Sequence, residues 1–309
     1  MDKGGVLLVS TPEDPHATCV LSILKSKGIP TAHFDLSTAQ QQMLDIIPGS
    51  HVQVGEARIV PGWTVWWRRA SVAPPDVWAT ALQREESELA HSELRDILLG
   101  GLLSLGLRWV DEPYAVLRAE QTLLQLAVAK RCGVRVPATR ATNDPATGGT
   151  FLSEGPTVAK AVSSGPGLAP YVANIDSTML SLLASGVTVL QHQTASIADV
   201  RVVVIGNETF SWRRPRGACD PVDWRESDPT GRLFVSVDGS EIHAAALAIN
   251  SGLGLSVSMQ DWVVDRDGDP TFLEANPCGA WLFLTGAREK VGPALAKHLI
   301  GLARSGAGP

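Results

Sequence analysis

The sequence predicts a mixed α/β protein in which a small α/β domain precedes a larger α+β region. Near the amino terminus, an apolar run at residues 6–9, a helical pattern at 15–27 and a strand pattern at 31–36 form a β-α-β unit. Near the carboxyl terminus, two strand patterns flank Asp267-Gly268, a dipeptide typical of antiparallel hairpins. Parallel pairing is therefore expected early in the chain and antiparallel pairing late.

The other elements follow in chain order between these two regions. Strands are predicted at residues 52–54, 57–60, 65–69, 134–139, 157–160, 200–205 and 209–213. Helices are predicted at 85–105 and 114–131, and loops at 142–149 and 163–167. The last two strands join through a Gly206-Asn207 turn, so they are expected to pair antiparallel. A new domain is expected to begin near residue 112.

Length and composition indicate a folded chain of two or more domains. Of the 309 residues, 44% are hydrophobic and 19% are charged, which is far from the composition of disordered proteins. A net charge of −6 argues against sequence-independent nucleic-acid binding, so no nucleic-acid partner is expected. The longest apolar run, residues 97–107, is about half the length of a membrane span. With no signal-peptide pattern at the amino terminus, a cytoplasmic location is expected.

Motifs of several other functional classes are absent from the sequence. There is no G-x-x-x-x-G-K-[ST] run, no complete dinucleotide fingerprint and no H-E-x-x-H pair. No serine has nucleophile-elbow spacing. The four cysteines also lack C-x-x-C spacing, so buried reduced thiols are expected rather than a disulfide or zinc framework: Cys19, Cys132, Cys219 and Cys278.

The hairpin around Asp267-Gly268 carries the clearest chemical signal. If these two residues form the turn, Asp261 faces Glu274 across the ladder, and Asn276 lies on the same face. The opposite face then holds Trp262, Val264, Thr271 and Leu273. Opposed carboxylates repel each other, so the pair needs either a cation or exposure to water. Two carboxylates and an amide suit Mg²⁺, whereas a solvated hairpin with outward-facing acids is the alternative.

Several motifs in the chain resemble one family. Residues 272–281 read Phe-Leu-Glu-Ala-Asn-Pro-Cys-Gly-Ala-Trp. This run resembles the Phe-Leu-Glu-x-Asn-Pro-x-Gly-x-Trp signature of ATP-grasp enzymes of the microviridin-maturase, or graspetide synthetase, type. Four further stretches resemble that family in the same order: Trp-Trp-Arg-Arg within 65–69, Gly-x-x-x-Pro-x-Thr at 133–139, Asp-x-Arg at 199–201 and Asp-Trp-Arg at 223–225. The resemblance spans nearly the whole chain.

The resemblance implies a fold, cofactors and partners. It implies an ATP-grasp fold with a pre-ATP-grasp α/β domain at residues 1–111, a central small lobe at 112–190 and a carboxy-terminal lobe with the metal site at 191–309. ATP and Mg²⁺ would be the cofactors. A precursor peptide with leader and core segments would be the partner, and a homodimer the assembly.

The resemblance also implies roles for individual residues. The metal ligands would be Asp261, Glu274 and Asn276. The nucleotide would contact Lys160 near its α-phosphate, the adenine hinge Gln191, His192 and Gln193, and Asp199 near its ribose. Phosphoryl charge would be neutralised in catalysis by Arg201, Arg213 and Arg225, and the acidic core peptide would meet Arg68 and Arg69.

Some of these residues have simpler explanations, and the chain departs from the family pattern at two positions. From the residues alone, Lys160 is interpreted as an exposed lysine at the end of a strand. Arg68 and Arg69 are likewise interpreted as side chains exposed to water at the end of a strand. Thr122 stands where the family has a phosphate-directed lysine, and His192 stands where related ligases often have glutamate. Both departures concern the nucleotide site.

The predicted function is that of a peptide maturase in the biosynthesis of ribosomally made, modified peptides (RiPPs). Such a ligase activates Asp or Glu side chains of a precursor peptide as acyl phosphates. It then forms macrocyclic ester or amide links with Thr, Ser or Lys. Two alternatives stay open: an ATP-grasp ligase that joins separate amino acids or peptides, and a non-catalytic peptide-binding homologue.

Overall fold

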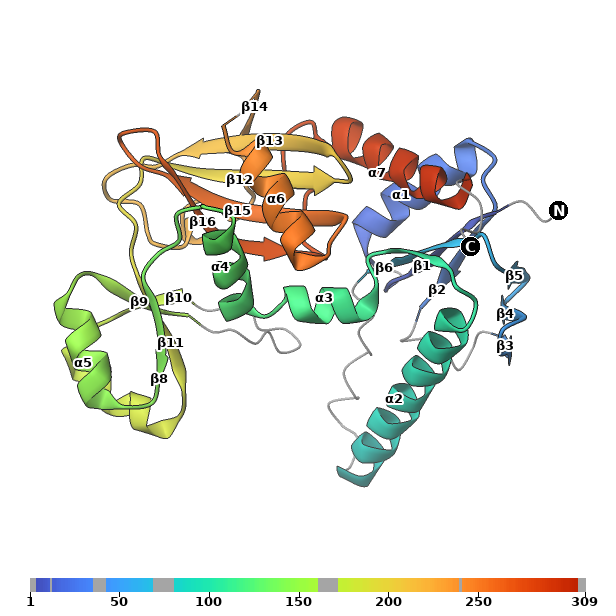
Figure 1. Ribbon diagram of the computed structural model, residues 1–309, viewed down its shortest axis with the longest axis horizontal. Coiled ribbons are helices and arrows are strands. Elements are labelled where there is room, and N and C mark those ends of the chain that lie inside the picture. The colour runs from blue at the N-terminus through green and yellow to red at the C-terminus, as the bar shows by residue number, and fades with distance from the viewer. Residues whose placement is uncertain are drawn as a thin grey trace.

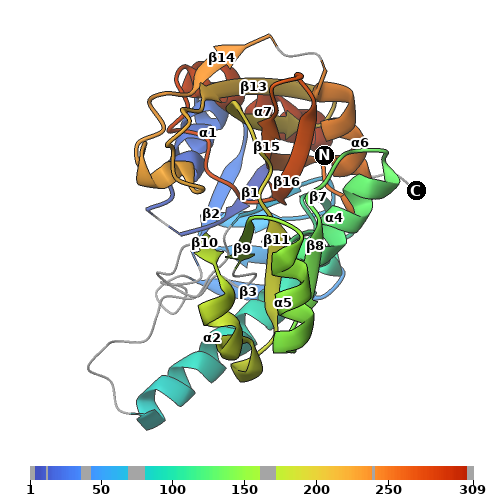
Figure 2. The same cartoon turned by 90° about the vertical axis from the view of Figure 1, so that its left-hand side faces the viewer.

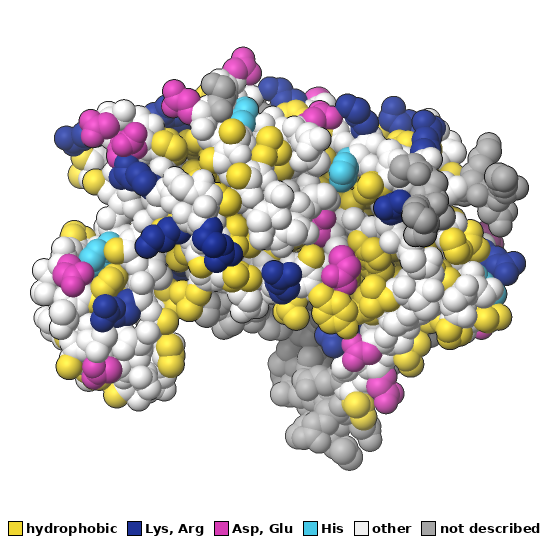
Figure 3. Space-filling model, in the orientation of Figure 1, with side chains coloured by type: hydrophobic (Ala, Val, Ile, Leu, Met, Phe, Trp, Pro, Cys, Tyr) yellow, Lys and Arg dark blue, Asp and Glu magenta, His cyan; other side chains and the backbone are white. Residues whose placement is uncertain are grey.

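The computed structural model describes residues 4–11, 13–35, 43–68, 81–160, 172–238 and 241–304. Its strands form four sheets, which build an amino-terminal unit, a small lobe and a large lobe (Figure 1). In the space-filling view the small lobe stands out from the rest of the molecule (Figure 3). No helix in the described ranges has the length and apolar character that crossing a membrane requires.

The amino-terminal unit contains a parallel sheet of order β2-β1-β6-β7 and a separate antiparallel sheet of order β3-β4-β5. The parallel strands are β1 (Val6–Val9), β2 (Thr31–Phe34), β6 (Thr64–Trp67) and β7 (Arg108–Val110). The second sheet contains β3 (Leu44–Ile47), β4 (His51–Val54) and β5 (Ala57–Ile59). The helices are α1 (Pro15–Ser26) and α2 (Ala81–Leu103). The β-α-β opening is confirmed, because β1 pairs with β2 in parallel.

The small lobe is an antiparallel sheet of order β10-β9-β11-β8 with helices on one side (Figure 2). It contains β8 (Thr139–Thr142), α5 (Pro145–Ser153), β9 (Thr157–Lys160), β10 (Val172–Ile175), the 3-10 helix η2 (Ser177–Ser185) and β11 (Thr188–His192). The loop predicted at 142–149 is wrong, because Asp144 caps α5 and Pro145 occupies its first position. A carboxylate cap followed by proline is a helix start signal. The loop predicted at 163–167 lies outside the described residues.

The large lobe is an antiparallel sheet of order β14-β13-β12-β15-β16. Its strands are β12 (Ala198–Ile205), β13 (Glu208–Pro215), β14 (Val235–Val237), β15 (Val257–Val264) and β16 (Pro270–Asn276). Its helices are α3 (Pro113–Ala119), α4 (Thr122–Arg131), the 3-10 helix η3 (Trp224–Glu226), α6 (His243–Leu253) and α7 (Ala287–Arg304). The single helix predicted at 114–131 is therefore two helices, because Gln121 takes an extended backbone conformation between them.

The two faces of the large sheet pack into different cores. Val200, Val202 and Val204 face the helices α4 and α6, whereas Val203 and Ile205 share a core with α7 and α1. The helices α3 and α4 thus pack on the large lobe, although the predicted boundaries place them in the small lobe. The helix α7 also joins the large sheet to the amino-terminal unit, where it lies against α1 (Figure 1).

The four cysteines are free thiols, as expected, but their burial differs from the prediction. Cys19 is buried, whereas Cys132 and Cys219 are exposed and Cys278 is half-buried. The predicted absence of a disulfide framework is consistent with this placement.

Candidate active site

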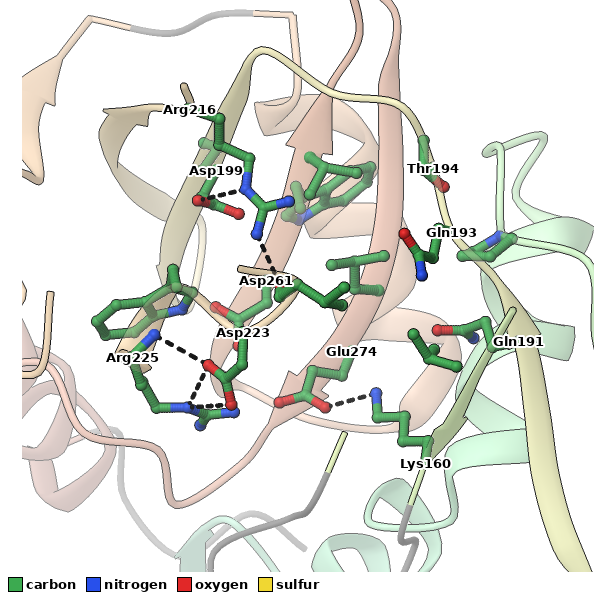
Figure 4. Close-up of a pocket in the computed structure, with 18 of the residues that line it drawn as sticks. Lys160, Gln191, Gln193, Thr194, Asp199, Arg216, Asp223, Arg225, Asp261 and Glu274 are labelled. Carbon is green, nitrogen blue, oxygen red and sulfur yellow. Dashed lines mark hydrogen bonds and ion pairs between the residues drawn. The ribbon is translucent and has the colours of Figure 1, made fainter. Parts of the chain in front are cut away.

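A pocket lies between the small lobe and the large sheet. Strands β9 and β11 supply Lys160 and Gln191 from one side, and β15 and β16 supply Asp261 and Glu274 from the other (Figure 4). Apolar side chains cover part of its wall, among them Pro137, Val158, Val263, Leu273, Trp224 and Phe234.

The β15–β16 hairpin confirms the predicted Asp261–Glu274 pair but reaches it by a different turn. The loop is three residues long, because Asp265 N–H donates to Asp269 O at 3.2 Å, and Gly268 adopts a φ of 91°. A one-residue change in the loop shifts the facing residue of every strand position. A β-bulge between Asp261 and Trp262 cancels the shift, so Asp261 still faces Glu274.

The bulge changes which side chains share each face. Trp262 pairs with Phe272, and their rings form a T-shaped contact with centroids 5.3 Å apart. Thr271, predicted on the Trp262 face, pairs with Val263 and therefore lies on the other face. Asn276 shares the Glu274 face as predicted, because its Nδ2 donates to Glu274 Oε1 at 3.0 Å.

Two cations from different strands compensate the paired carboxylates. Lys160 Nζ of the small lobe lies 2.8 Å from Glu274 Oε2, and Arg201 Nη1 of β12 donates to Asp261 Oδ1 at 2.5 Å. The side chains of Asp261 and Glu274 are 22% and 21% exposed, respectively, whereas Lys160 is 9% exposed. Lys160 is therefore a buried partner of Glu274 rather than a solvated lysine at a strand end.

The surroundings shift the pKa values of the Asp261 and Glu274 carboxyl groups in opposite directions. Burial raises the pKa of Asp261 above its ordinary value, and the neighbouring Glu274 charge adds to this, although Arg201 opposes it. Burial also favours the neutral acid at Glu274, but Lys160, Asn276 and Arg201 together outweigh it and lower the pKa of Glu274 to about 2. Glu274 is thus ionised near neutral pH, held by a cation from the opposite lobe.

The donor set at this pair fits Mg²⁺. Asp261 and Glu274 offer carboxylate oxygens and Asn276 an amide oxygen, which are hard ligands. Within the described ranges, no three or more His, Cys, Asp or Glu side chains are grouped as a metal site. Mg²⁺ is commonly bound by one or two carboxylates together with substrate phosphates, so two carboxylates and an amide are compatible with it.

The three arginines predicted for catalysis lie in different places. Arg201 contacts Asp261, and the exposed Arg225 lines the pocket beside Asp223. Arg213 is wrong as a pocket residue: it pairs with Val200 and is exposed on the sheet face opposite Asp261. Its neighbour Arg214 pairs with Asp199 and lies on the same face of the sheet as Asp261, because side chains alternate along a strand.

Asp199 belongs to a buried network of arginines that sequence reasoning missed. Its carboxylate accepts hydrogen bonds from Arg214 Nη1 and Arg216 Nε, both at 3.0 Å. Burial raises the pKa of Asp199, while the two guanidinium groups oppose this. Arg216 also donates to the carbonyls of Pro221 and Val222, which fixes the segment that carries Asp223 and Arg225 into the pocket (Figure 4). Asp199 thus positions the pocket wall.

The predicted hinge residues lie at the end of β11 and line the pocket. Gln191 donates to Thr139 Oγ1 at 3.0 Å. The His192 ring stacks on Phe151, with centroids 4.1 Å apart. Gln191 Nε2 and His192 Nε2 are thus engaged within the small lobe, the latter 3.0 Å from Phe151 O, and an adenine contact there stays a prediction.

Arg68, predicted to meet the substrate, is buried at 1% exposure in the amino-terminal unit. Its Nε donates to Asp14 Oδ2 at 2.7 Å, and its Nη1 donates to Gly279 O at 3.2 Å. Arg68 therefore joins the amino-terminal unit to the segment that follows β16, which corrects the prediction. Arg69 lies outside the described residues.

Solved structures of similar fold cover nearly the whole chain. The macrocyclase MdnC from Microcystis aeruginosa MRC, bound with precursor peptide MdnA, is 21% identical, with a TM-score of 0.79 over 96% of this chain and 99% of that one. An ATP-grasp ligase of Chryseobacterium gregarium, associated with a RiPP and in complex with ADP and a leader and core peptide, is 18% identical with a TM-score of 0.81. That alignment covers 96% of this chain and 97% of the ligase. The chain has the ATP-grasp fold.

A third ATP-grasp structure, the ligase PsnB complexed with minimal precursor, Mg and ADP, is 21% identical with a TM-score of 0.79. It covers 97% of each chain. No family model and no curated protein sequence matches this chain. The similarity therefore rests on the three-dimensional fold.

Proposed function

We propose that this chain is an ATP- and Mg²⁺-dependent ligase that forms macrocyclic ester or amide links within a ribosomally made precursor peptide. The observation that carries the proposal is the meeting of Lys160, from the small lobe, with Glu274 and its partner Asp261 inside an interlobe pocket. The fold neighbours bound to ADP, Mg or precursor peptides support this choice of ligands.

In the proposed reaction, an Asp or Glu carboxylate of the peptide attacks the γ-phosphorus of ATP, and ADP leaves. A Thr or Ser hydroxyl, or a Lys amine, then attacks the acyl carbon of the acyl phosphate. Phosphate leaves, and the attacking group loses its proton. A bound Mg²⁺ supplies charge neutralisation for the phosphoryl oxygens.

The residues of the chain would bind and position the reactants. Asp261, Glu274 and Asn276 would hold Mg²⁺, and Lys160 and Arg201 would then be free to face phosphate oxygens instead of carboxylates. Arg225 adds positive charge at the same pocket. Fixed donors of this kind suit phosphoryl transfer, which depends on charge stabilisation and positioning.

The nucleotide base would lie against the apolar wall near Gln191, His192 and Gln193. Asp199 would lie near the ribose, where Arg214 and Arg216 hold its carboxylate in place. We further propose that the chain is cytoplasmic, and that it forms the homodimer that the family resemblance of its sequence implies. Light scattering of the purified chain measures the assembly.

Mass spectrometry of a precursor peptide incubated with the chain and MgATP tests the proposed function. The peptide should carry Thr or Ser residues ahead of Asp or Glu, and it should lose one water per ring while ADP is released. Glu274→Gln should abolish both changes, whereas Asp267→Asn, in the turn of the same hairpin, should leave them intact. A gain in mass with an added amine would instead indicate a ligase of separate substrates. Absence of precursor-dependent ADP release would refute catalysis.

A further inference from the structure

We propose that Gln125 is a positioning residue: its side-chain amide bonds the backbone of β16 at the outer edge and thereby holds Glu274 and Asn276 in place. We call this contact the clamp. The clamp is part of the fold, whereas its effect on metal binding rests on the proposed function. The sequence resemblance assigns no role to Gln125.

Among the described residues, β16 is the edge of its sheet, so none of the described strands pairs with the peptide groups on its outer side. One contact on this side comes from the chain that leads into the small lobe, where Phe272 N–H donates to Arg135 O at 2.9 Å. The next contact lies further along, at Ala275, between two of the three proposed metal ligands. In the described part of the chain, the outer edge is therefore bonded at separate points and not by a continuous ladder.

The side-chain amide of Gln125 bonds both backbone groups of Ala275. Its Nε2 donates to Ala275 O at 2.8 Å, and its Oε1 accepts from Ala275 N–H at 2.9 Å. The second hydrogen of Nε2 goes to Ala119 O at 2.6 Å, at the end of α3. Gln125 is 4% exposed, so water does not readily replace these bonds.

This pattern suits an amide and few other side chains. A glutamine presents a donor and an acceptor with the spacing of a peptide group, so it can bond the N–H and the C=O of one residue at once. A glutamate of the same shape could accept from Ala275 N–H but would face two carbonyl oxygens. A methionine of similar length would leave three buried backbone groups without a partner, which is costly.

The clamp lies where a small displacement would disturb the proposed metal site. Ala275 is flanked by Glu274 and Asn276. The side chains of these two residues lie on the face of the strand opposite to that of the Ala275 side chain, and they bond each other. Groups that orient metal ligands commonly change metal affinity about 10- to 100-fold when they are mutated. We therefore expect the loss of Gln125 to weaken metal binding without altering any metal-binding atom.

Two measurements on Gln125→Met and Gln125→Glu test the proposal in the full chain. Amide hydrogen exchange should become at least about tenfold faster in peptides that contain Ala275, while β12 and β13 keep their protection. Mn²⁺ binding in the presence of ADP, followed by electron paramagnetic resonance without turnover, should weaken about 10-fold or more. The matched control is Gln121→Met, because Gln121 is exposed between α3 and α4 and its side chain donates to Leu117 O, away from β16.

The outcomes separate the clamp from the proposed function. Exchange and Mn²⁺ affinity within twofold of wild type in both Gln125 variants would overturn the proposal. If exchange changes but Mn²⁺ affinity does not, Gln125 supports the strand without positioning the ligands, and the positioning role is refuted. If the wild-type chain itself binds no Mn²⁺ with ADP, the proposed function fails, while the exchange result still decides whether the clamp exists.

Discussion

Replacing Arg68 with methionine distinguishes a structural clamp from a substrate contact. Arg68 and Asp14 form an ion pair with side chains that are 1% and 3% exposed. Arg68 also bonds Gly279 O, and its guanidinium lies over the Trp66 ring at 5.6 Å from the centroid. Methionine keeps much of the apolar length but removes the charge and all of the donors.

The expected loss follows from the burial of this pair. Removing one partner of a buried ion pair leaves the other charge uncompensated, which typically costs about 3–5 kcal/mol. His16 remains as a neighbour of Asp14, so the lower half of that range is expected. The free energy of unfolding should therefore fall by about 3 kcal/mol in Arg68→Met.

Urea unfolding at neutral pH measures this effect, with Arg58→Met as the control because Arg58 is exposed in the same unit. A decrease below about 1 kcal/mol, the range of exposed ion pairs, would refute the structural role of Arg68. A substrate contact would instead raise the KM for the precursor and leave unfolding unchanged.

The pH dependence gives a second check on the same pair. Burial alone favours the neutral acid at Asp14, but the His16 hydrogen bond and the Arg68 charge outweigh it and hold the pKa of Asp14 well below its usual value of 3.8. A lowered acid pKa contributes stability that is present above the unfolded-state pKa and lost as pH falls through the folded-state value. The difference between wild type and Arg68→Met should therefore persist down to about pH 4 and shrink below it.

Three further predictions follow from the placement of other residues. Arg213→Met should leave ADP release within about twofold of wild type, whereas Arg214→Met should lower the free energy of unfolding by about 3 kcal/mol, because only Arg214 is in a buried ion pair. In Gly279→Ala the added Cβ would lie 2.8 Å from a side-chain carbon of β15, so thermal unfolding should show a loss of about 1–3 kcal/mol, while Gly155→Ala, with open space, should not. Trp224 lines the pocket, so Trp224→Phe should remove most of the tryptophan fluorescence change that MgATP causes; an unchanged response would contradict this.

The β15–β16 hairpin shows how far sequence reasoning reached and where it stopped. Period-two alternation and the Asp267-Gly268 signal placed Asp261 opposite Glu274, and the structure agrees. The turn has a different length, however, and the bulge that cancels the difference has no sequence signal of its own. The face of Thr271 was consequently predicted wrongly.

The arginines show a signal that was present but not used. The Gly206-Asn207 turn places Asp199 opposite Arg214, as the structure has it. The same alternation that located Asp261 and Glu274 would have selected Arg214 over Arg213 for the pocket face. The contact of Arg68 with Gly279 had no comparable signal, because the two residues belong to different units of the fold.

The sequence by itself determined the local elements of this protein: the β-α-β opening, the antiparallel pairs and the opposed carboxylates of the hairpin. These depend on side-chain periodicity and turn residues, which act between neighbours in the chain. Only the tertiary structure decided that Lys160 meets Glu274, that Gln125 bonds the edge of β16 and that Arg68 is a clamp. These contacts join residues 114, 150 and 211 positions apart. Their geometry depends on how whole sheets and helices pack, which no local pattern specifies.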